Sequence, residues 1–226
     1  MVSKMADEYR GKFIVLEGLD GAGTTTQSSR LAKYLFEKEK RNTVLVTREP
    51  TNLSPYGKEL RRRLRGELLS GEEVIHDAQY WADLFVNDRK WHLNEFVVPA
   101  VNRGQHVISD RHKLSTLAYQ TTQGHDMDHL INMHNGLYLP DLTLFLDVSS
   151  KIALDRINIR GTGTVNAEYF ERTDFLARVC DNYQVAIDKL KATENIAVID
   201  GTKPIDDVEK LIQAEIDKLF GYKSKS

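Results

Sequence analysis

The strongest constraint on the fold is a short apolar run followed by a glycine-rich segment. Phe13–Glu17 is apolar up to its last residue and predicts a buried strand, while a helical pattern carrying Leu31 and Leu35 starts at about Thr25. The nine residues from Gly18 to Thr26 between them read GLDGAGTTT. A strand, a glycine-rich turn and a helix in this order are typical of a phosphate-binding loop.

The segment nearly matches the phosphate-loop pattern G-x-x-x-x-G-K-[ST]. Its glycines, Gly18, Gly21 and Gly23, let the backbone curl so that N–H groups and the positive end of the following helix point at phosphate oxygens. Thr24 stands where the pattern has lysine, and the next lysine is Lys33. Thr25 keeps the hydroxyl position that meets Mg²⁺ in such loops.

Other interpretations of this segment are weaker. A dinucleotide-binding loop needs G-x-G-x-x-G/A, and the stretch from Gly21 ends in Thr26, which disfavours a hydride-transfer enzyme. A guanine-nucleotide switch protein would carry N-K-x-D downstream, and the sequence lacks it. A tight connection that binds no ligand stays open on this segment alone.

Further strands and helices alternate along the chain. Four more β-branched runs predict strands, at Thr43–Thr47, His106–Asp110, Leu142–Asp147 and Ile196–Asp200. Helical patterns place Leu60, Leu64 and Leu68 four residues apart and cover about 72–103, 170–193 and 205–220. This alternation predicts an α/β fold with a five-stranded parallel sheet flanked by helices. We expect one domain over residues 1–226, with a core at about 12–215 and frayed ends.

Composition excludes several classes of protein. The 226 residues include 31 basic and 33 acidic side chains, a net charge of −2, which argues against nucleic acid or an anionic membrane as the main partner. Apolar runs fall well short of the roughly 18 residues of a membrane-spanning helix. Residues 1–12 lack the apolar stretch of a secretory signal, and the lone Cys180, which we assign to buried packing, cannot form an internal disulfide. These features predict a cytoplasmic protein.

Polar side chains gather at the predicted strand ends, where parallel sheets bind ligands. Arg48 follows the second strand, Asp110 and Arg111 close the third, and Phe85 and Arg89 lie four apart on one helix face. Three arginines near a phosphate loop suggest a second anionic group beside the first.

With these residues in place, the sequence resembles the thymidylate kinase family over about residues 12–215. The similarity rests on FIVLEGLDGAG, TREP, LFVNDRKWH, VVPAV, SDRHKLSTLAYQ, PDLTLFLDV and FERTDFLARV. The resemblance implies a three-layer, P-loop nucleoside monophosphate kinase fold and a homodimer. It also implies transfer of the ATP γ-phosphoryl group to dTMP with Mg²⁺, giving dTDP and ADP.

The resemblance also implies roles for individual residues. For the base of dTMP, Phe85 stacks on thymine and Arg89 binds its O4 edge, while the base pocket is lined by Ser115, Thr116 and Gln120. For the sugar, Tyr119 packs on the deoxyribose and Asp20 lies near the 3′-hydroxyl. The dTMP phosphate is held by Arg48 and Arg111. The ATP site comprises Gly18, Gly21, Ala22, Gly23, Thr24, Thr25, Thr26 and Arg156. Mg²⁺ lies near Thr25 and Asp110, with Glu17 close behind.

Because Thr24 replaces the lysine of the phosphate loop, we ask which other cation acts on the transferring phosphate. The acceptor phosphate is largely ionised at neutral pH, so catalysis depends on positioning and fixed positive charge rather than a general base. Thymidylate kinases place a catalytic arginine in the phosphate loop or in a lid, here about residues 151–175, and this loop has none. We expect Arg160 to supply the charge, with Arg156 nearer the adenine, Arg172 a further candidate, and Arg111 and Asp110 completing the catalytic group. Tyr169 stands where the lid pattern often has arginine.

Two clusters are assigned no function. The basic run Arg61, Arg62, Arg63 and Arg65 is interpreted as a solvated helix face. The cluster of His125, Asp126, Asp128, His129 and His134 lacks the glutamate of H-E-x-x-H and is not expected to bind metal. Two alternative functions remain open: a nucleotide-binding pseudo-kinase, and a kinase for another deoxynucleoside monophosphate.

Overall fold

A parallel sheet of five strands forms the centre of the molecule. The computed structural model describes residues 10–70, 72–73, 77–160 and 167–222, without the side chains of 159–160 and 167–172. The strand order is β2-β3-β1-β4-β5, with every neighbouring pair parallel. The strands are β1 (Phe13–Gly18), β2 (Val44–Arg48), β3 (His106–Asp110), β4 (Leu142–Asp147) and β5 (Ile196–Asp200). All five predicted strands are confirmed, to within one residue at their ends.

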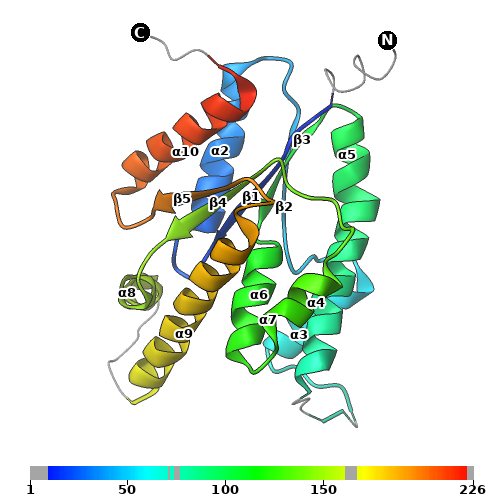
Figure 1. Cartoon of the computed structure of the whole chain (residues 1–226), viewed down its shortest axis with the longest axis vertical. Helices are drawn as coiled ribbons and strands as arrows, with labels where there is room; N and C mark the ends of the chain where they lie inside the picture. The colour runs from blue at the N-terminus through cyan, green and yellow to red at the C-terminus, as the bar shows by residue number, and fades with distance from the viewer. Residues whose placement is uncertain (1–9, 71, 74–76, 161–166, 223–226) are drawn as a thin grey trace.

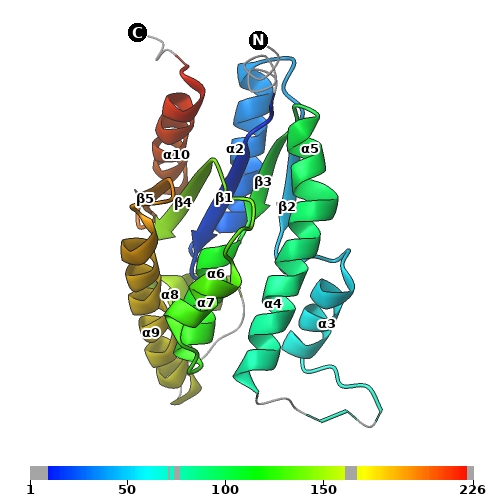
Figure 2. The same cartoon turned by 45° about the vertical axis from the view of Figure 1, so that its right-hand side comes forward.

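Helices cover both faces of the sheet (Figures 1 and 2). They are α2 (Thr24–Lys38), α3 (Pro55–Leu64), α4 (Ala78–His92), η1 (Leu93–Val97), α5 (Val98–Asn102), α6 (Lys113–Thr122), α7 (Met127–Met133), α8 (Ser150–Arg160), α9 (Ala167–Leu190) and α10 (Ile205–Phe220). Helices α2 and α10 pack on each other and on one face, while α5, α6 and α9 lie on the other. The predicted three-layer α/β class is therefore confirmed.

Burial explains why the central strands form. Every residue of β1 and β3 is buried, because helices cover both sides of these strands. Ile14 and Leu16 pack into the larger apolar core, whereas Phe13 and Val15 pack with η1 and α5 on the other side. The edge strands β2 and β5 are half-exposed, so the prediction of strands covered on both faces holds only for the three inner strands.

Three helix predictions need correction. The helix predicted at 72–103 starts only at Ala78, where Asp77 caps it. It is continuous into α5 but contains a π-helical turn at Leu93–Val97. Figure 2 shows α4 and α5 as one continuous rod beside the sheet. Helix α3 ends at Leu64, so Leu68 lies outside it; Gly66 follows with a φ of 72°. The pattern at 170–193 corresponds to a helix that already starts at Ala167 and ends at Leu190.

The short helices α6, α7 and α8 were not predicted from periodicity, and α10 matches its predicted range. Cys180 is half-buried against the main core, as expected for a packing residue, and burial raises the pKa of its thiol to about 11. Among the described residues, no helix has the length and apolar character needed to cross a membrane.

Candidate active site

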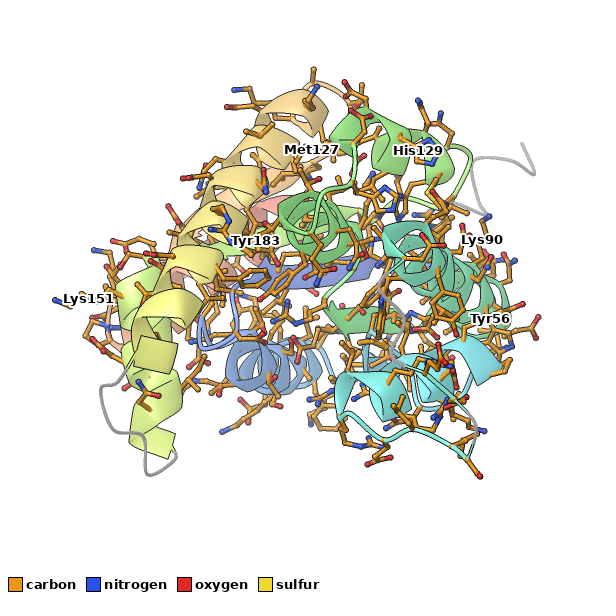
Figure 3. The ribbon with its side chains drawn as sticks, turned by 90° about the horizontal axis from the view of Figure 1, so that it is seen from below. Tyr56, Lys90, Met127, His129, Lys151 and Tyr183 are labelled. Carbon is orange, nitrogen blue, oxygen red and sulfur yellow. The ribbon has the colours of Figure 1, made fainter. Side chains whose placement is uncertain are left out.

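The phosphate loop connects β1 to α2 at the carboxyl edge of the sheet, which Figure 3 shows from below. Gly21 and Gly23 have φ angles of 89° and 102°, values that favour glycine. A Cβ on Gly21 would lie 2.3 Å from the carbonyl oxygen of Ala153 in α8, so the loop and α8 meet backbone to backbone. Helix α2 starts at Thr24 without a side-chain cap. Its first N–H groups are therefore available to an anion.

Thr25 and Asp110 lie directly beside this helix start. The Thr25 hydroxyl donates to Oδ2 of Asp110 at 2.5 Å, and the Arg48 guanidinium lies 3.6 Å from the same oxygen. Oδ1 of Asp110 is buried and has no hydrogen-bond partner among the described residues. These two oxygen donors fit Mg²⁺, which is commonly held by one or two carboxylates together with substrate phosphates. No group of three or more metal-ligating side chains occurs in the described part of the chain.

A cavity of about 310 Å³ opens on one side of the loop. Of the nine residues expected to bind dTMP, eight line it: Asp20, Phe85, Arg89, Arg111, Ser115, Thr116, Tyr119 and Gln120. The ninth, Arg48, lines an adjoining hollow of about 360 Å³ with Thr25 and Asp110. Sequence reasoning missed several wall residues of the main cavity, including Trp81, Leu64 and Gln123.

A polar cluster stands between the loop and this cavity. Arg111 donates to Oδ1 of Asp20 at 2.6 Å and to the Ser115 hydroxyl at 2.9 Å, and the Tyr119 hydroxyl lies 3.2 Å from Oδ2 of Asp20. Burial raises the pKa of Tyr119 to about 12, so its hydroxyl stays protonated. Arg111 is the one non-glycine residue in the described ranges with a positive φ, 80°, and such strain clusters at functional sites.

The floor of the cavity is a buried ionic network around Arg89, whose relative exposure is 1%. Nε and Nη2 of Arg89 donate to Glu49 Oε2 at 2.9 and 2.6 Å, and Nη2 donates to the Thr116 hydroxyl at 3.0 Å. His92 contacts the other Glu49 oxygen at 2.9 Å. Burial opposes ionisation of Glu49, but Arg89 and the neighbouring histidines outweigh it and hold its pKa well below the usual range. This arrangement fixes a guanidinium at the closed end of the pocket.

Glu17, which the resemblance places close behind Mg²⁺, has a carboxylate that is hydrogen-bonded inside the protein. Its carboxylate is fully buried and accepts from the backbone N–H groups of His112 and Ser115 at 2.9 and 3.1 Å, and from the Ser115 hydroxyl. Burial, the largest cause, raises its pKa. Glu17 therefore caps the start of α6 and orients Ser115, and both of its carboxylate oxygens accept hydrogen bonds from these residues.

Asp88 was missed in the sequence and holds the chain after β2. It accepts from the backbone N–H and hydroxyl of Thr51, both at 2.7 Å, and from the Ser54 hydroxyl. Ser54 in turn caps α3 through the N–H of Gly57 at 2.8 Å. The segment with Arg48 and Glu49 is thereby anchored to α4, the helix that supplies Arg89.

A second cavity, of about 490 Å³, opens on the other side of the loop. Gly21, Ala22, Gly23, Thr26 and Arg156 line it, whereas Thr24 is buried and Thr25 faces the Asp110 side. Sequence reasoning missed its far wall, Gly201 to Ile205, although that segment directly follows β5 at the same sheet edge.

Arg156 joins the two walls of this second cavity. Its guanidinium donates to the carbonyl oxygens of Gly201 at 2.9 Å and Ala22 at 3.5 Å. The side chains of Arg160, Tyr169 and Arg172 lie outside the described residues, as do residues 161–166.

Tyr183 of α9 supports both the loop and the cavity wall. Its hydroxyl donates to the carbonyl oxygen of Gly18 at 3.1 Å and lies 2.9 Å from the Ser115 hydroxyl. In Figure 3 this side chain lies near the middle of the molecule, between α9 and α6.

The basic run is not a freely solvated face. Arg62 and Arg63 are ion-paired with Glu59 and Glu72, and Arg65 pairs with Glu67. Arg61 donates to the carbonyl of Pro50. Burial, the largest cause, and the charge of Arg48 lower its pKa. Glu59 precedes Arg62 and Arg63 by three and four residues, the spacing at which side chains on a helix meet.

The histidine cluster also separates in the structure. His125 and His129 stack with ring centroids 6.1 Å apart, whereas His134 is buried and contacts Nη1 of Arg89.

Comparison with known proteins finds similar sequences over most of the chain. A family model described as "Thymidylate kinase" matches residues 16–212. A "Probable thymidylate kinase" from Pyrococcus horikoshii is 38% identical over 209 residues, which cover 91% of this chain and 95% of that protein. The "Thymidylate kinase" of Clostridium novyi is 34% identical, covering 88% and 95%, and that of Nitrosospira multiformis is 36% identical, covering 93% and 99%.

Proposed function

We infer from its membership of the thymidylate kinase family that this chain phosphorylates dTMP to dTDP. The observation that carries this function is the pair of cavities on either side of one phosphate loop, one lined by Phe85 and Arg89 and the other by the loop backbone and Arg156. We propose that dTMP occupies the first cavity and ATP the second, with their phosphates meeting at Thr25 and Asp110.

The chain's own groups bring two anions together. Arg111 and Arg48 offset the charge of the dTMP phosphate, whose oxygen attacks the γ-phosphorus of ATP as the bond to the β-phosphate oxygen breaks and ADP leaves. The N–H groups at the start of α2 hold the donor phosphates. Mg²⁺, bound near Thr25 and Asp110, would neutralise charge on the donor phosphates. No residue needs to take a proton from the acceptor, since its phosphate is largely ionised at neutral pH.

Within the acceptor site, side chains divide between base and sugar. Phe85 stacks on thymine and Arg89 donates to its O4, beside Thr116 and Gln120. Tyr119 packs on the deoxyribose, and Asp20 lies near the 3′-hydroxyl. The contacts of Asp20 with Arg111 and Tyr119 support this placement, since they put the three side chains at the junction of cavity and loop.

A coupled ADP-release assay with dTMP, dUMP, dGMP and dCMP tests the function. Turnover of dTMP with ATP and Mg²⁺ is expected. Turnover with a purine acceptor alone would contradict the thymine assignment. Ligand-induced thermal stabilisation by dTMP without turnover of any acceptor would favour a nucleotide-binding pseudo-kinase, the alternative that the threonine at position 24 suggests.

The replacement for the phosphate-loop lysine is part of the proposal. Thr24 has no charge to place on the transferring phosphate, and loss of one such preorganised group costs roughly 10²–10³ in rate in other enzymes. We assign the compensating charge to Arg160. Arg156, held by two backbone carbonyls, instead fixes the adenine-side wall.

Single-turnover phosphoryl transfer by Arg156→Ala, Arg160→Ala and Arg172→Ala separates these roles. Lys151→Ala, an exposed substitution in the same helix α8, is the matched control. Arg160→Ala is expected to lower the transfer rate about 100-fold. If all three arginine variants stay within a few-fold of wild type, the lid does not supply the missing charge.

Three further features complete the proposal. The protein acts as a single catalytic domain, as a homodimer, and in the cytoplasm, where ATP and dTMP are found. Sedimentation velocity at micromolar concentration tests the dimer, which a monomeric species alone would contradict.

A further inference from the structure

The hydrogen bonds of Arg89 are almost all used inside the protein. A guanidinium carries five N–H donors. Glu49 takes the Nε donor and one Nη2 donor, Thr116 takes the second Nη2 donor, and His134 takes one from Nη1. One Nη1 hydrogen remains without a partner among the described residues. Because Arg89 lines the acceptor cavity, this hydrogen is the donor it can offer to a ligand.

The hydrogen bonds of His134 fix its tautomer. Nδ1 lies 2.7 Å from the carbonyl oxygen of Leu130, which can only accept, so Nδ1 carries the proton. Nε2 is then an acceptor, 2.5 Å from Nη1 of Arg89. Burial and the charge of Arg89 lower the pKa of His134 to about 3, which keeps the ring neutral and its Nε2 lone pair free to accept.

We propose that His134 is a positioning residue for acceptor specificity: by binding one Nη1 hydrogen it directs the other toward the keto oxygen of a pyrimidine base. This inference rests on the proposed function and adds to it a residue outside the loop and strand-end motifs. His134 lies after α7, next to a cavity whose base-binding residues come from α4 and α6.

The chemistry predicts which bases are distinguished. Thymine and uracil present an oxygen at position 4, which accepts from Arg89. Cytosine presents an amino group there, whose hydrogens would face the guanidinium and leave its donor unpaired. A site built to hydrogen-bond one such group rejects the analogue that lacks it far better than an apolar pocket does. The 5-methyl group that separates dTMP from dUMP lies outside this interaction.

Two conservative substitutions separate the nitrogens of His134. His134→Gln places an amide oxygen near the Nε2 position and keeps an acceptor for Arg89. His134→Asn keeps a polar group near the Nδ1 position, within reach of the Leu130 carbonyl, but does not reach Arg89. Binding of dTMP, dUMP and dCMP is measured by isothermal titration calorimetry, with competition for weak ligands. Thermal unfolding verifies that each variant is folded.

Wild type and His134→Gln should bind dTMP and dUMP at least tenfold more tightly than dCMP. In His134→Asn, affinity for dTMP and dUMP should fall about tenfold while that for dCMP stays within twofold, so that the dTMP to dUMP ratio is unchanged. An equal loss for all three nucleotides, or no loss, would overturn the positioning role. Failure of the wild-type protein to bind dTMP at all would instead overturn the proposed function on which that role depends.

Discussion

Acid should destabilise this protein well above the pH at which carboxylates titrate. His134 and His112 are both buried, with 4% relative exposure each. Burial, the largest cause in both, lowers the pKa of His134 to about 3 and that of His112 well below its usual value. The ring of His134 is therefore neutral in the folded protein at pH 5, and folding also disfavours protonation of His112. In the unfolded chain both rings take up protons near pH 6.5.

The sign and size of the effect follow from proton linkage. A base whose pKa is lower when folded stabilises the protein above its unfolded pKa, and this contribution is lost as pH falls toward the folded pKa. For His134 this loss amounts to up to about 1.4 kcal/mol per pH unit below 6.5, or about 2 kcal/mol between pH 7 and 5. The lowered pKa of His112 adds a loss of the same sign. Glu17, whose pKa is raised, takes up a proton earlier in the folded state and offsets part of this loss.

Urea denaturation at half-unit intervals from pH 7 to 5 measures the slope. This range stays above the titration of Glu49, whose lowered pKa adds a further loss only in stronger acid. His134→Gln should reduce the loss of unfolding free energy between pH 7 and 5 by about 2 kcal/mol. His129→Gln, at an exposed position of α7, is the control and should keep the wild-type slope. A free energy of unfolding that is flat from pH 7 to 5 in the wild type would refute the reasoning.

Four other substitutions probe the site. Gly23→Ala should cost about 1–2 kcal/mol of unfolding free energy, because Gly23 has a positive φ although no atom would contact the new Cβ. Gly21→Ala should cost more, because its Cβ would also meet a backbone oxygen. Equal urea midpoints for the two variants would contradict this. Asp110→Asn should raise the Mg²⁺ concentration at half-maximal rate and lower turnover roughly 100-fold, measured by Mg²⁺ titration of the ADP-release assay. Asp88→Ala should cost about 3 kcal/mol in urea denaturation, because three buried donors lose their acceptor, and a loss below 1 kcal/mol would show that the segment after β2 is held elsewhere.

Local patterns were enough for the strands and the phosphate loop. Buried parallel strands are apolar on both faces, so runs such as Phe13–Glu17 stand out without any knowledge of their partners. The parallel sheet then brings all strand ends to one edge, which is why Asp110 and Arg111 could be grouped with the loop in advance.

Features that depend on tertiary partners were missed. Glu17 at a strand end is equally suited to lie near a metal or to cap a helix, and the sequence does not show that the His112 and Ser115 N–H groups donate to it. His134 is 45 residues from Arg89, so nothing in the sequence indicates that these two side chains are in contact.

The double contact of Tyr183 gives the phosphate loop and the wall of the Arg89 cavity a shared support. One hydroxyl on α9 touches the entrance of the phosphate loop and the serine that orients Arg111. A shift of α9 would thus be transmitted to the donor and acceptor sides in the same step. The proposed alignment of the two nucleotides therefore depends on the position of this one helix, even though the two cavities are built from different parts of the chain.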